Sequence, residues 1–145
     1  MSYETILLKK ENHIAILTMN RPDKMNALTR KMLLEMVDAV SDVAQDRDIR
    51  VMILTGAGKV FCSGADLGGG GWEAGLAGPP NELNYNIRTS YQRVSLGMQS
   101  MEKPTIAMVN GAAVGAGCDF AFACDMRVGT ERSKFRNSFV KVGLI

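Results

Sequence analysis

The stretch "TIAMVNGAAVGAGCDFAFACD", from Thr105 to Asp125, combines three local patterns. The continuous apolar run "TIAMV" is typical of a buried strand. Asn110 and Gly111 form a turn signal, and further glycines lead into a nearly all-apolar segment over 118–124. A helix that is apolar all round is expected to be buried. The stretch therefore predicts a strand, a glycine-bearing turn and a buried helix in succession.

The same organisation occurs earlier in the chain. The run "VMILT", from Val51 to Thr55, predicts a second buried strand, and the glycine-bearing "SGAD" follows it. Upstream, Tyr3 to Lys9 and His13 to Met19 predict a β-hairpin. Two copies of a strand, a glycine turn and an acidic residue favour an α/β fold of stacked strand–turn–helix units.

Helices are predicted between these strands. Thr29 is the predicted N-cap of a helix that runs to about Gln45, with apolar residues at helical spacing. A second helix is predicted over 84–101, ended by the Lys103-Pro104 pair. Two strand-like segments, "MRVGT" and "KFRNSFVKVGLI", close the chain.

The glycine-rich stretch "KVFCSGADLGGGGWEAGLAGPP" predicts a mobile loop, with a phosphate-binding loop as the alternative. The alternative fails two tests. Phe61 occupies the third glycine position of a dinucleotide-binding G-x-G-x-x-G after the strand, and the chain holds no G-x-x-x-x-G-K-[ST] motif. A dinucleotide-binding fold is therefore disfavoured.

The composition indicates one soluble globular domain over residues 1–145. Hydrophobic residues make up 46% of the chain and charged residues 22%. The net charge is only +2 and no basic stripe is present, so we expect no nucleic-acid partner. No apolar run reaches the roughly 18 residues of a membrane span, so we expect no membrane partner either.

The cysteine and histidine content excludes further classes. Cys62, Cys118 and Cys124 lack metal-ligand spacing, and their odd number argues against a disulfide framework. Buried, reduced thiols in a cytoplasmic protein are the expectation, and the N-terminus lacks a signal-peptide layout. His13 is the only histidine, which disfavours histidine-based triads and metal sites.

Asp119, at the edge of the apolar segment, has two possible roles. A carboxylate near a helix N-terminus is a common capping group. Alternatively, it faces a pocket in which a proton moves. The glycines let main-chain N–H groups approach a ligand, and those of Ala65 and Ala116 could converge on one oxygen as an oxyanion hole, each worth about 3 kcal/mol in the transition state. A carboxylate beside such a hole is suited to general acid–base chemistry.

Taken together, these segments resemble the enoyl-CoA hydratase/isomerase family, the crotonases. The similarity rests on "ILTMNRPDKMNAL", "VMILTGAGKVFCSGADL", "KPTIAMVNGAAVGAGCDFAFACDMRV" and "SKFRNSFVKVGLI", which together span almost the whole chain. The resemblance implies a spiral of ββα units that binds an acyl-CoA thioester and stabilises its enolate. It implies no separate cofactor and no metal, because CoA arrives as part of the substrate.

The resemblance also implies roles for single residues. Ala65 and Ala116 would supply the oxyanion N–H groups, and Asp119 would take the first acid–base position, where hydratases usually carry the longer Glu. Lys24 could equally be a solvated surface charge, and Asp66 a turn residue. The positions that match the CoA-binding segments are Lys24, Met25, Ala27, Asp66, Leu67 and Gly68.

The chain departs from the family pattern at two points. Phe139 stands where the second catalytic Glu is expected, which suits a drier or aromatic acyl pocket and leaves Glu73 as a candidate second acid. The chain also stops at Ile145, inside an apolar run, whereas family members continue with helices that close the acyl pocket and assemble trimers. We therefore expect a fragment that lacks those helices, and a homo-oligomer, trimer or hexamer, where they are present.

The expected activity is that of an enoyl-CoA hydratase/isomerase-type lyase. Isomerisation, decarboxylation or thioester hydrolysis need only the oxyanion hole and one acid–base group, so they stay open alternatives. A non-catalytic CoA-binding or scaffolding protein is the alternative from a different class.

Overall fold

A computed structural model describes residues 3–142 of the chain. Its main sheet begins with an antiparallel hairpin of β1 (Ile6–Glu11) and β2 (Ile14–Met19). Asn12 and His13 connect the two strands with φ angles of 51° and 67°, which are the left-handed values that a tight type I′ hairpin turn needs. The hairpin predicted from the sequence is therefore confirmed.

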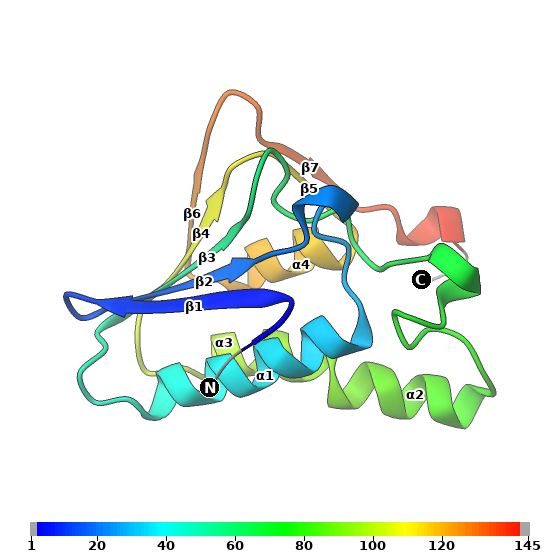
Figure 1. Cartoon of the computed structure of the whole chain (residues 1–145), viewed down its shortest axis with the longest axis horizontal. Coiled ribbons are helices and arrows are strands. Elements are labelled where there is room, and N and C mark those ends of the chain that lie inside the picture. Colours follow the sequence, from blue (N-terminus) through cyan, green and yellow to red (C-terminus); the bar gives the residue numbers. More distant parts are fainter. Residues whose placement is uncertain (1–2, 143–145) are drawn as a thin grey trace.

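Three further strands extend this sheet in parallel. They are β3 (Val51–Gly56), β4 (Thr105–Val109) and β6 (Met126–Gly129), and the strand order is β1-β2-β3-β4-β6 (Figure 1). Both buried apolar runs of the sequence are thus neighbouring central strands, as predicted. Parallel strands need crossover connections, and here each crossover contains a helix.

A second, smaller sheet pairs β5 (Ala112–Val114) with β7 (Lys134–Arg136) in parallel. Two isolated parallel bridges continue the line of this smaller sheet. One joins Leu28 to Ala65, and the other joins Cys62 to Ala113. Each repeating unit of the chain therefore contributes one strand to the main sheet. It also contributes one short extended segment, which pairs with the corresponding segment of the next unit. This repeat is the stacked-unit architecture that the sequence predicts.

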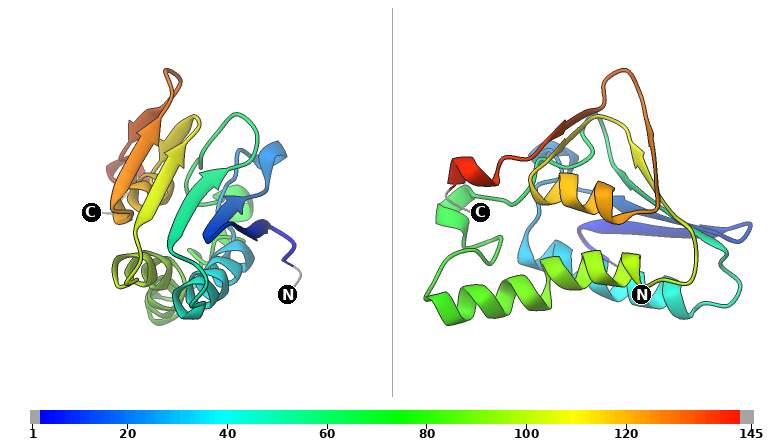
Figure 2. Two further views of the ribbon diagram at one scale, coloured as in Figure 1. Left: turned by 90° about the vertical axis from the view of Figure 1, so that its left-hand side faces the viewer. Right: turned by 180° about the vertical axis from the view of Figure 1, so that it is seen from behind.

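Helices cover one side of the main sheet (Figure 2). The helix α1 (Arg30–Gln45) packs on β1, β2 and α3 (Tyr91–Gln99), while α4 (Ala116–Ala123) lies between α3 and the strands β4 and β5. The apolar face of α1 is fully buried against this core, together with Phe61 and Phe120. As predicted, Thr29 caps α1: its Oγ1 accepts a hydrogen bond from the N–H of Met32 at 3.2 Å.

The prediction of a single helix over 84–101 is wrong. The chain forms two helices, α2 (Pro80–Thr89) and α3, separated at Ser90, whose φ of −125° and ψ of −80° are not helical. Ser90 is fully buried, and its hydroxyl donates to the carbonyl of Asn86. Helical spacing of apolar residues continues across the break, so the pattern alone did not reveal it.

The prediction of a strand in the last segment, "KFRNSFVKVGLI", is also only partly correct. Its beginning forms β7, but a short 3-10 helix, η3 (Phe139–Val142), replaces the expected strand. The final residues 143–145 lie outside the described part of the chain. In two views η3 lies beside η2 (Gly68–Gly71), the 3-10 helix of the glycine-rich segment (Figures 1 and 2).

Asn26 joins the first turn of the chain to the second. It is fully buried, and its Nδ2 donates to the carbonyls of Ala57 and Val60 at 2.9 Å and 2.7 Å, while its Oδ1 accepts from the N–H of Arg21 at 2.9 Å. Its φ of 53° is a left-handed value that Asn tolerates better than most residues.

We expect Asn26→Ala to lower the free energy of unfolding by about 3 kcal/mol, because the part-buried carbonyls of Ala57 and Val60 lose their donor. Urea denaturation measures this change. Asn26→Gly relieves the backbone strain but not the lost bonds, so it should remain strongly destabilised. The exposed Asn81→Ala is the control and should stay within about 0.5 kcal/mol. A mild effect of both Asn26 variants would contradict the assigned hydrogen-bonding role.

Candidate active site

A cavity of about 620 Å³ opens where the two glycine turns meet α2, α3 and η3. One wall consists of the turns themselves, at Ser63–Ala65 and Val114–Ala116. The rest of the lining consists of side chains from the helices and from the glycine-rich segment. The larger side chains that line the cavity are Leu67, Leu76, Ile87, Tyr91, Gln92, Leu96, Asp119, Phe120 and Phe139.

Main-chain hydrogen bonds hold the two glycine turns together. The N–H of Cys62 donates to the carbonyl of Ala112 at 3.0 Å, and the N–H of Val114 donates to the carbonyl of Cys62 at 2.9 Å. Gly64, with a φ of +93°, leaves no room for a Cβ, which would lie 2.9 Å from the Val114 oxygen. The two turns are therefore in direct contact, although 50 residues separate them in the sequence.

Gly117 brings α4 into contact with the same turn. A Cβ at this position would lie 2.6 Å from the Cβ of Cys62, closer than real side chains approach. We expect Gly117→Ala to lower the free energy of unfolding by about 1–3 kcal/mol, because a methyl group overpacks this contact. Thermal and urea unfolding measure the change. An unfolding free energy equal to that of the unaltered protein would show that the helix can move away without cost.

The three cysteines are buried and unpaired, as the sequence analysis expects. Burial raises the pKa of the Cys62 thiol to about 12, so this thiol is neutral at physiological pH. Its Sγ lies 3.3 Å from the carbonyl oxygen of Asn26 and 3.4 Å from the N–H of Gly64. These contacts give Cys62 a role in holding the first glycine turn.

The main-chain N–H of Ala65 faces away from its neighbouring segment. In the parallel bridge to Leu28, the flanking groups form the bonds: Gly64 accepts from the N–H of Leu28 at 2.8 Å, and the N–H of Asp66 donates to the carbonyl of Leu28 at 2.9 Å. The Ala65 N–H therefore lies on the opposite side, where Ala65 lines the cavity. Within residues 3–142 it has no hydrogen-bond acceptor.

The N–H of Ala116 is also without an acceptor in that part of the chain. Ala116 is the first residue of α4, and the first N–H groups of a helix have no partner within the helix. They also carry the positive end of the helix dipole. Ala65 and Ala116 therefore both line the same cavity, and neither main-chain N–H has an acceptor among the described residues.

Asp119 lies in the first turn of α4 and lines the cavity. It does not cap the helix: Gly115 is the N-cap, and no side-chain cap bond is formed. Although Asp119 is exposed on the cavity side, the surrounding apolar wall removes part of its hydration, which raises the pKa of the carboxyl above its usual range. It is the only carboxylate among the described residues that line the cavity.

The structure does not support Glu73 as a second acid. Glu73 is exposed on the glycine-rich segment and does not line the cavity. Its carbonyl accepts from the N–H of Arg30 at 2.6 Å, which fixes the segment with the side chain outside the site. Phe139, in contrast, does line the cavity, and its ring packs near Gly115.

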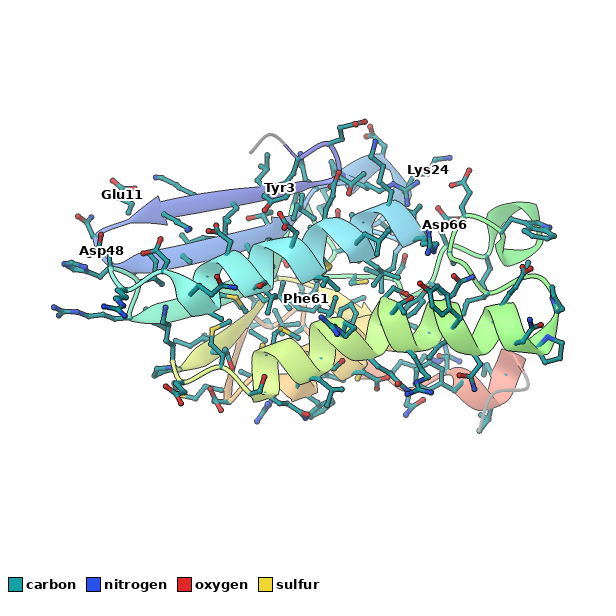
Figure 3. All side chains as sticks on the ribbon, turned by 90° about the horizontal axis from the view of Figure 1, so that it is seen from below. Tyr3, Glu11, Lys24, Asp48, Phe61 and Asp66 are labelled. Carbon is teal, nitrogen blue, oxygen red and sulfur yellow. The ribbon has the colours of Figure 1, made fainter. Side chains whose placement is uncertain are left out.

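The segments expected to bind CoA lie side by side at one end of the molecule, where Figure 3 shows Lys24 and Asp66. The N–H of Ser63 donates to the carbonyl of Met25 at 3.1 Å. Lys24 and Met25 are exposed, Ala27 is half-buried, and Leu67 and Gly68 are exposed beside the cavity. The structure thus brings the two segments together, and their role in CoA binding stays a prediction.

Asp66 has a structural role in this cluster. Its Oδ2 pairs with Nη1 of Arg21 at 3.0 Å, and its Oδ1 accepts from the N–H of Gly68 at 3.1 Å. The guanidinium of Arg21 lowers the pKa of the Asp66 carboxyl. Arg21 also donates to the carbonyl of Ala27 at 2.5 Å, so it ties both segments together. Sequence reasoning missed Arg21, because it lies in a stretch that indicated only a loop.

Among residues 3–142, no three His, Cys, Asp or Glu side chains come together as metal ligands would. In the same range, every helix is too short or too polar to cross a lipid bilayer.

Solved structures place the fold among those of enoyl-CoA hydratases and isomerases. An enoyl-CoA hydratase/isomerase from Xanthobacter autotrophicus superposes with a TM-score of 0.89 at 34% identity, over 98% of this chain and 52% of that one. The sequence profile of the enoyl-CoA hydratase/isomerase family matches residues 9–145. The chain belongs to this family, and the predicted crotonase-like α/β fold is confirmed.

Curated relatives are similar to this protein over almost its whole chain. The crotonyl-CoA hydratase of Syntrophomonas wolfei is 40% identical over 145 residues, which are 99% of this chain and 54% of the relative. The (E)-benzylidenesuccinyl-CoA hydratase of Thauera aromatica is 38% identical over 138 residues, or 94% of this chain and 51% of the relative. The chain thus spans about half the length of the curated relatives it matches.

Proposed function

We propose that this protein is an acyl-CoA enzyme that forms a thioester enolate. The single observation that carries the proposal is the convergence of two unpaired main-chain N–H groups and one carboxylate on one cavity. The thioester oxygen would accept from Ala65 and Ala116, which favours the negative charge that develops as the enolate forms. Asp119 would transfer the proton at the neighbouring carbon.

Hydration of a 2-enoyl thioester is the first candidate reaction, because several relatives are named for it. Water adds at C3, its proton leaves to a base, and the electron pair of the double bond moves onto the thioester oxygen. A proton then returns to C2 and the enolate collapses. With Asp119 as the only carboxylate in the described cavity, it would both accept the water proton and deliver a proton to C2.

Isomerisation is the second candidate, and Phe139 favours it. The carboxylate of Asp119 would remove a proton from C2 of a 3-enoyl thioester, and the resulting dienolate would rest on the two N–H groups. The same carboxyl group would return the proton to C4, which leaves the double bond between C2 and C3. This route needs one acid–base group and no water, and an aromatic ring beside the site keeps water out.

CoA recognition would fall to the exposed cluster around Lys24. Lys24 and Met25 would contact the nucleotide portion, with Ala27 behind them, and Leu67 and Gly68 would border the path from there to the cavity. Asp66 would act through its turn and its ion pair with Arg21.

The test is incubation of the protein with 2-enoyl-CoA and 3-enoyl-CoA thioesters, followed by mass analysis of the products. A gain of one water identifies hydration, whereas an unchanged mass with a shifted double bond identifies isomerisation. If a broad panel shows no turnover while CoA thioesters still bind, the protein is a CoA-binding member of the family without catalysis.

The pH dependence of turnover should report Asp119. A base is active in its ionised form, so kcat/KM should fall as the pH drops through the pKa of this carboxyl. Because desolvation raises that pKa, we expect the acidic limb above the usual range of aspartate, which is near 4. Measurement of kcat/KM between pH 4 and pH 9 checks this, and a limb at or below pH 4 would contradict the assignment.

A further inference from the structure

We propose that Asn110 is a positioning residue that fixes how the two glycine turns pair, and thereby holds the main chain of Ala65 and Ala116 at one cavity. The inference rests on the proposed function only in its consequence for catalysis, because the pairing itself is measured without substrate. It follows from a change of register between the two sheets, from the hydrogen bonds of Asn110 and from the close packing of Gly111.

The pairing of the glycine turns does not continue the register of the main sheet. In that sheet, Leu54 of β3 pairs with Ala107 of β4, which lies 53 positions further along the chain. In the isolated bridge, Cys62 pairs with Ala113, which lies only 51 positions further along. The chain that follows β3 therefore has two more residues between these pairings than the chain that follows β4. The register of the bridge must be set by contacts outside the ladder of the main sheet.

The bridge specifies its own register only weakly. Two main-chain hydrogen bonds define it, from the N–H of Cys62 to the carbonyl of Ala112 and from the N–H of Val114 to the carbonyl of Cys62. Both segments are short and carry glycines, and such strands slip easily between alternative pairings. A slip of one residue would move Ala116 by about 3.3 Å relative to Ala65, so the two N–H groups would no longer serve one oxygen.

Asn110 binds the longer segment near its start. Its Nδ2 donates to the carbonyls of Gly56 and Gly58 at 2.8 Å and 2.9 Å. Because carbonyl oxygens only accept hydrogen bonds, the nitrogen rather than the oxygen of this side chain must face them. Its Oδ1 is buried and has no donor within residues 3–142. One side chain thus binds two carbonyls of the segment in which the two additional residues are accommodated.

The same loop is also held by the first repeating unit. Nδ2 of Asn26 donates to the carbonyls of Ala57 and Val60, so the carbonyls bound by the two asparagines alternate along the loop. Hydrogen bonds at four carbonyls restrict the conformations that the loop can adopt. The loop is therefore a fixed reference to which Asn110 attaches the beginning of the second glycine turn.

Gly111 brings the main chain of the second turn against this loop. A Cβ at position 111 would overlap the carbonyl oxygen of Lys59 and would lie 3.1 Å from the Cα of Val60. The glycine permits the close approach, and the side chain of Asn110 determines which carbonyls the chain packs against. Since β5 begins at the next residue, its register against residues 61–65 is set at this contact.

Hydrogen exchange measured by NMR tests the pairing without substrate. In Asn110→Ala, the protection of the Cys62 and Val114 N–H groups should fall at least tenfold relative to that of the N–H groups of β3. The reason is that two hydrogen bonds that hold the register are lost, while the main sheet keeps its ladder. Unchanged relative protection in the folded variant would overturn the proposal.

A second variant and a control separate the lost donor from other effects. Asn110→Asp has nearly the same shape but no NH₂ group, so it should lose at least as much protection as Asn110→Ala. Thr55→Val is the control: it removes the bond from Oγ1 to the carbonyl of Met108 at 2.9 Å, which joins the same two units outside the turns. Its relative protection should stay within about threefold. Retained protection in Asn110→Asp, or an equal loss in Thr55→Val, would contradict the assigned role.

A measurement on the unaltered protein covers the case in which the Asn110 variants do not fold. The side-chain NH₂ of Asn110 should have a protection factor within tenfold of those of the Cys62 and Val114 N–H groups, because these groups are released together. A protection factor more than tenfold lower at the side chain would show that the pairing persists without it, and the proposal would fail.

The consequence for catalysis is a loss of kcat rather than of binding. A displaced N–H group weakens an interaction that is strongest in the transition state, so kcat of Asn110→Ala should fall at least tenfold, with KM within about threefold. Kinetics are measured below the melting temperature of every variant. Thr55→Val should keep both constants within about threefold. Lost protection in Asn110→Ala with an unchanged kcat would overturn the link between the pairing and the site.

These measurements separate the inference from the proposed function. Lost protection at Cys62 and Val114 in Asn110→Ala, in a protein that turns over no thioester, would sustain the role of Asn110 in the pairing and overturn the enzyme. Turnover that depends on Asp119 but is unchanged in Asn110→Ala, together with unchanged protection, would sustain the enzyme and overturn the role of Asn110.

Discussion

Replacement of Asp119 by Asn should reduce turnover of enoyl-CoA thioesters by about 10²–10⁴-fold, because the amide cannot accept or deliver the proton. The affinity for saturated acyl-CoA should change little, since the two main-chain donors remain. The melting temperature should stay equal or rise slightly. The folded state raises the pKa of Asp119, so it binds this proton more tightly than the unfolded chain, and the ionised carboxylate opposes folding at neutral pH.

The sign of the stability effect provides an internal check. The contribution of Asp119 to stability is most favourable at low pH, where the group is protonated in both states, and decreases as the pH rises from the unfolded pKa to the higher folded pKa. The advantage of the Asn variant should therefore appear only above this window. Asp48→Asn is the matched control and should retain full turnover, because Asp48 is exposed and lies at the other end of the molecule from Lys24 and Asp66 (Figure 3). Full turnover in the Asp119 variant would end its assignment as the proton-transfer group.

Replacement of Ala116 by Pro should lower kcat by about 10²–10³-fold, because it deletes one of the two main-chain donors. Proline lacks an N–H, yet the first position of a helix is where proline fits best, and Ala116 holds that position in α4. The fold should therefore survive, with a melting temperature close to that of the unaltered protein. Steady-state kinetics and thermal melting together check the prediction.

Ala116→Gly is the matched control, because glycine keeps the N–H and removes only the methyl group. Its kcat should lie within a few-fold of the unaltered protein. If the proline variant is folded and keeps its kcat, the oxygen of the thioester binds elsewhere. If the glycine variant loses activity as severely as the proline variant, the side chain rather than the N–H group carries the effect.

Local sequence signals are sufficient to predict much of the fold. Thr29 marked the start of α1 because its hydroxyl is chemically suited to the free N–H of Met32, and both residues lie within one turn. The break at Ser90 escaped because it depends on burial between α2 and α3, which no short stretch of sequence reports. The helical spacing continues through it, so tertiary packing overrode the local pattern.

The site was predictable in its parts but not in its assembly. The glycine neighbours and the family resemblance single out Ala65 and Ala116 as candidates, whereas their placement at one cavity depends on contacts such as that between Cys62 and Gly117. Glu73 was misplaced because the length of a glycine-rich segment does not reveal which side chain points inward. Arg21 was missed because an arginine in a loop carries no signature until its carboxylate partner is known.

The bridge between Leu28 and Ala65 has a consequence for protein engineering. It orients the peptide unit through neighbouring backbone atoms, so any residue other than proline at position 65 that keeps this backbone path should present the same N–H to the ligand. An alanine scan would not detect a role of this main-chain N–H, because substitution of the side chain leaves it unchanged. Position 65 can therefore be varied to reshape the cavity for new thioesters, and the proposed contact between its N–H and the thioester oxygen would be kept.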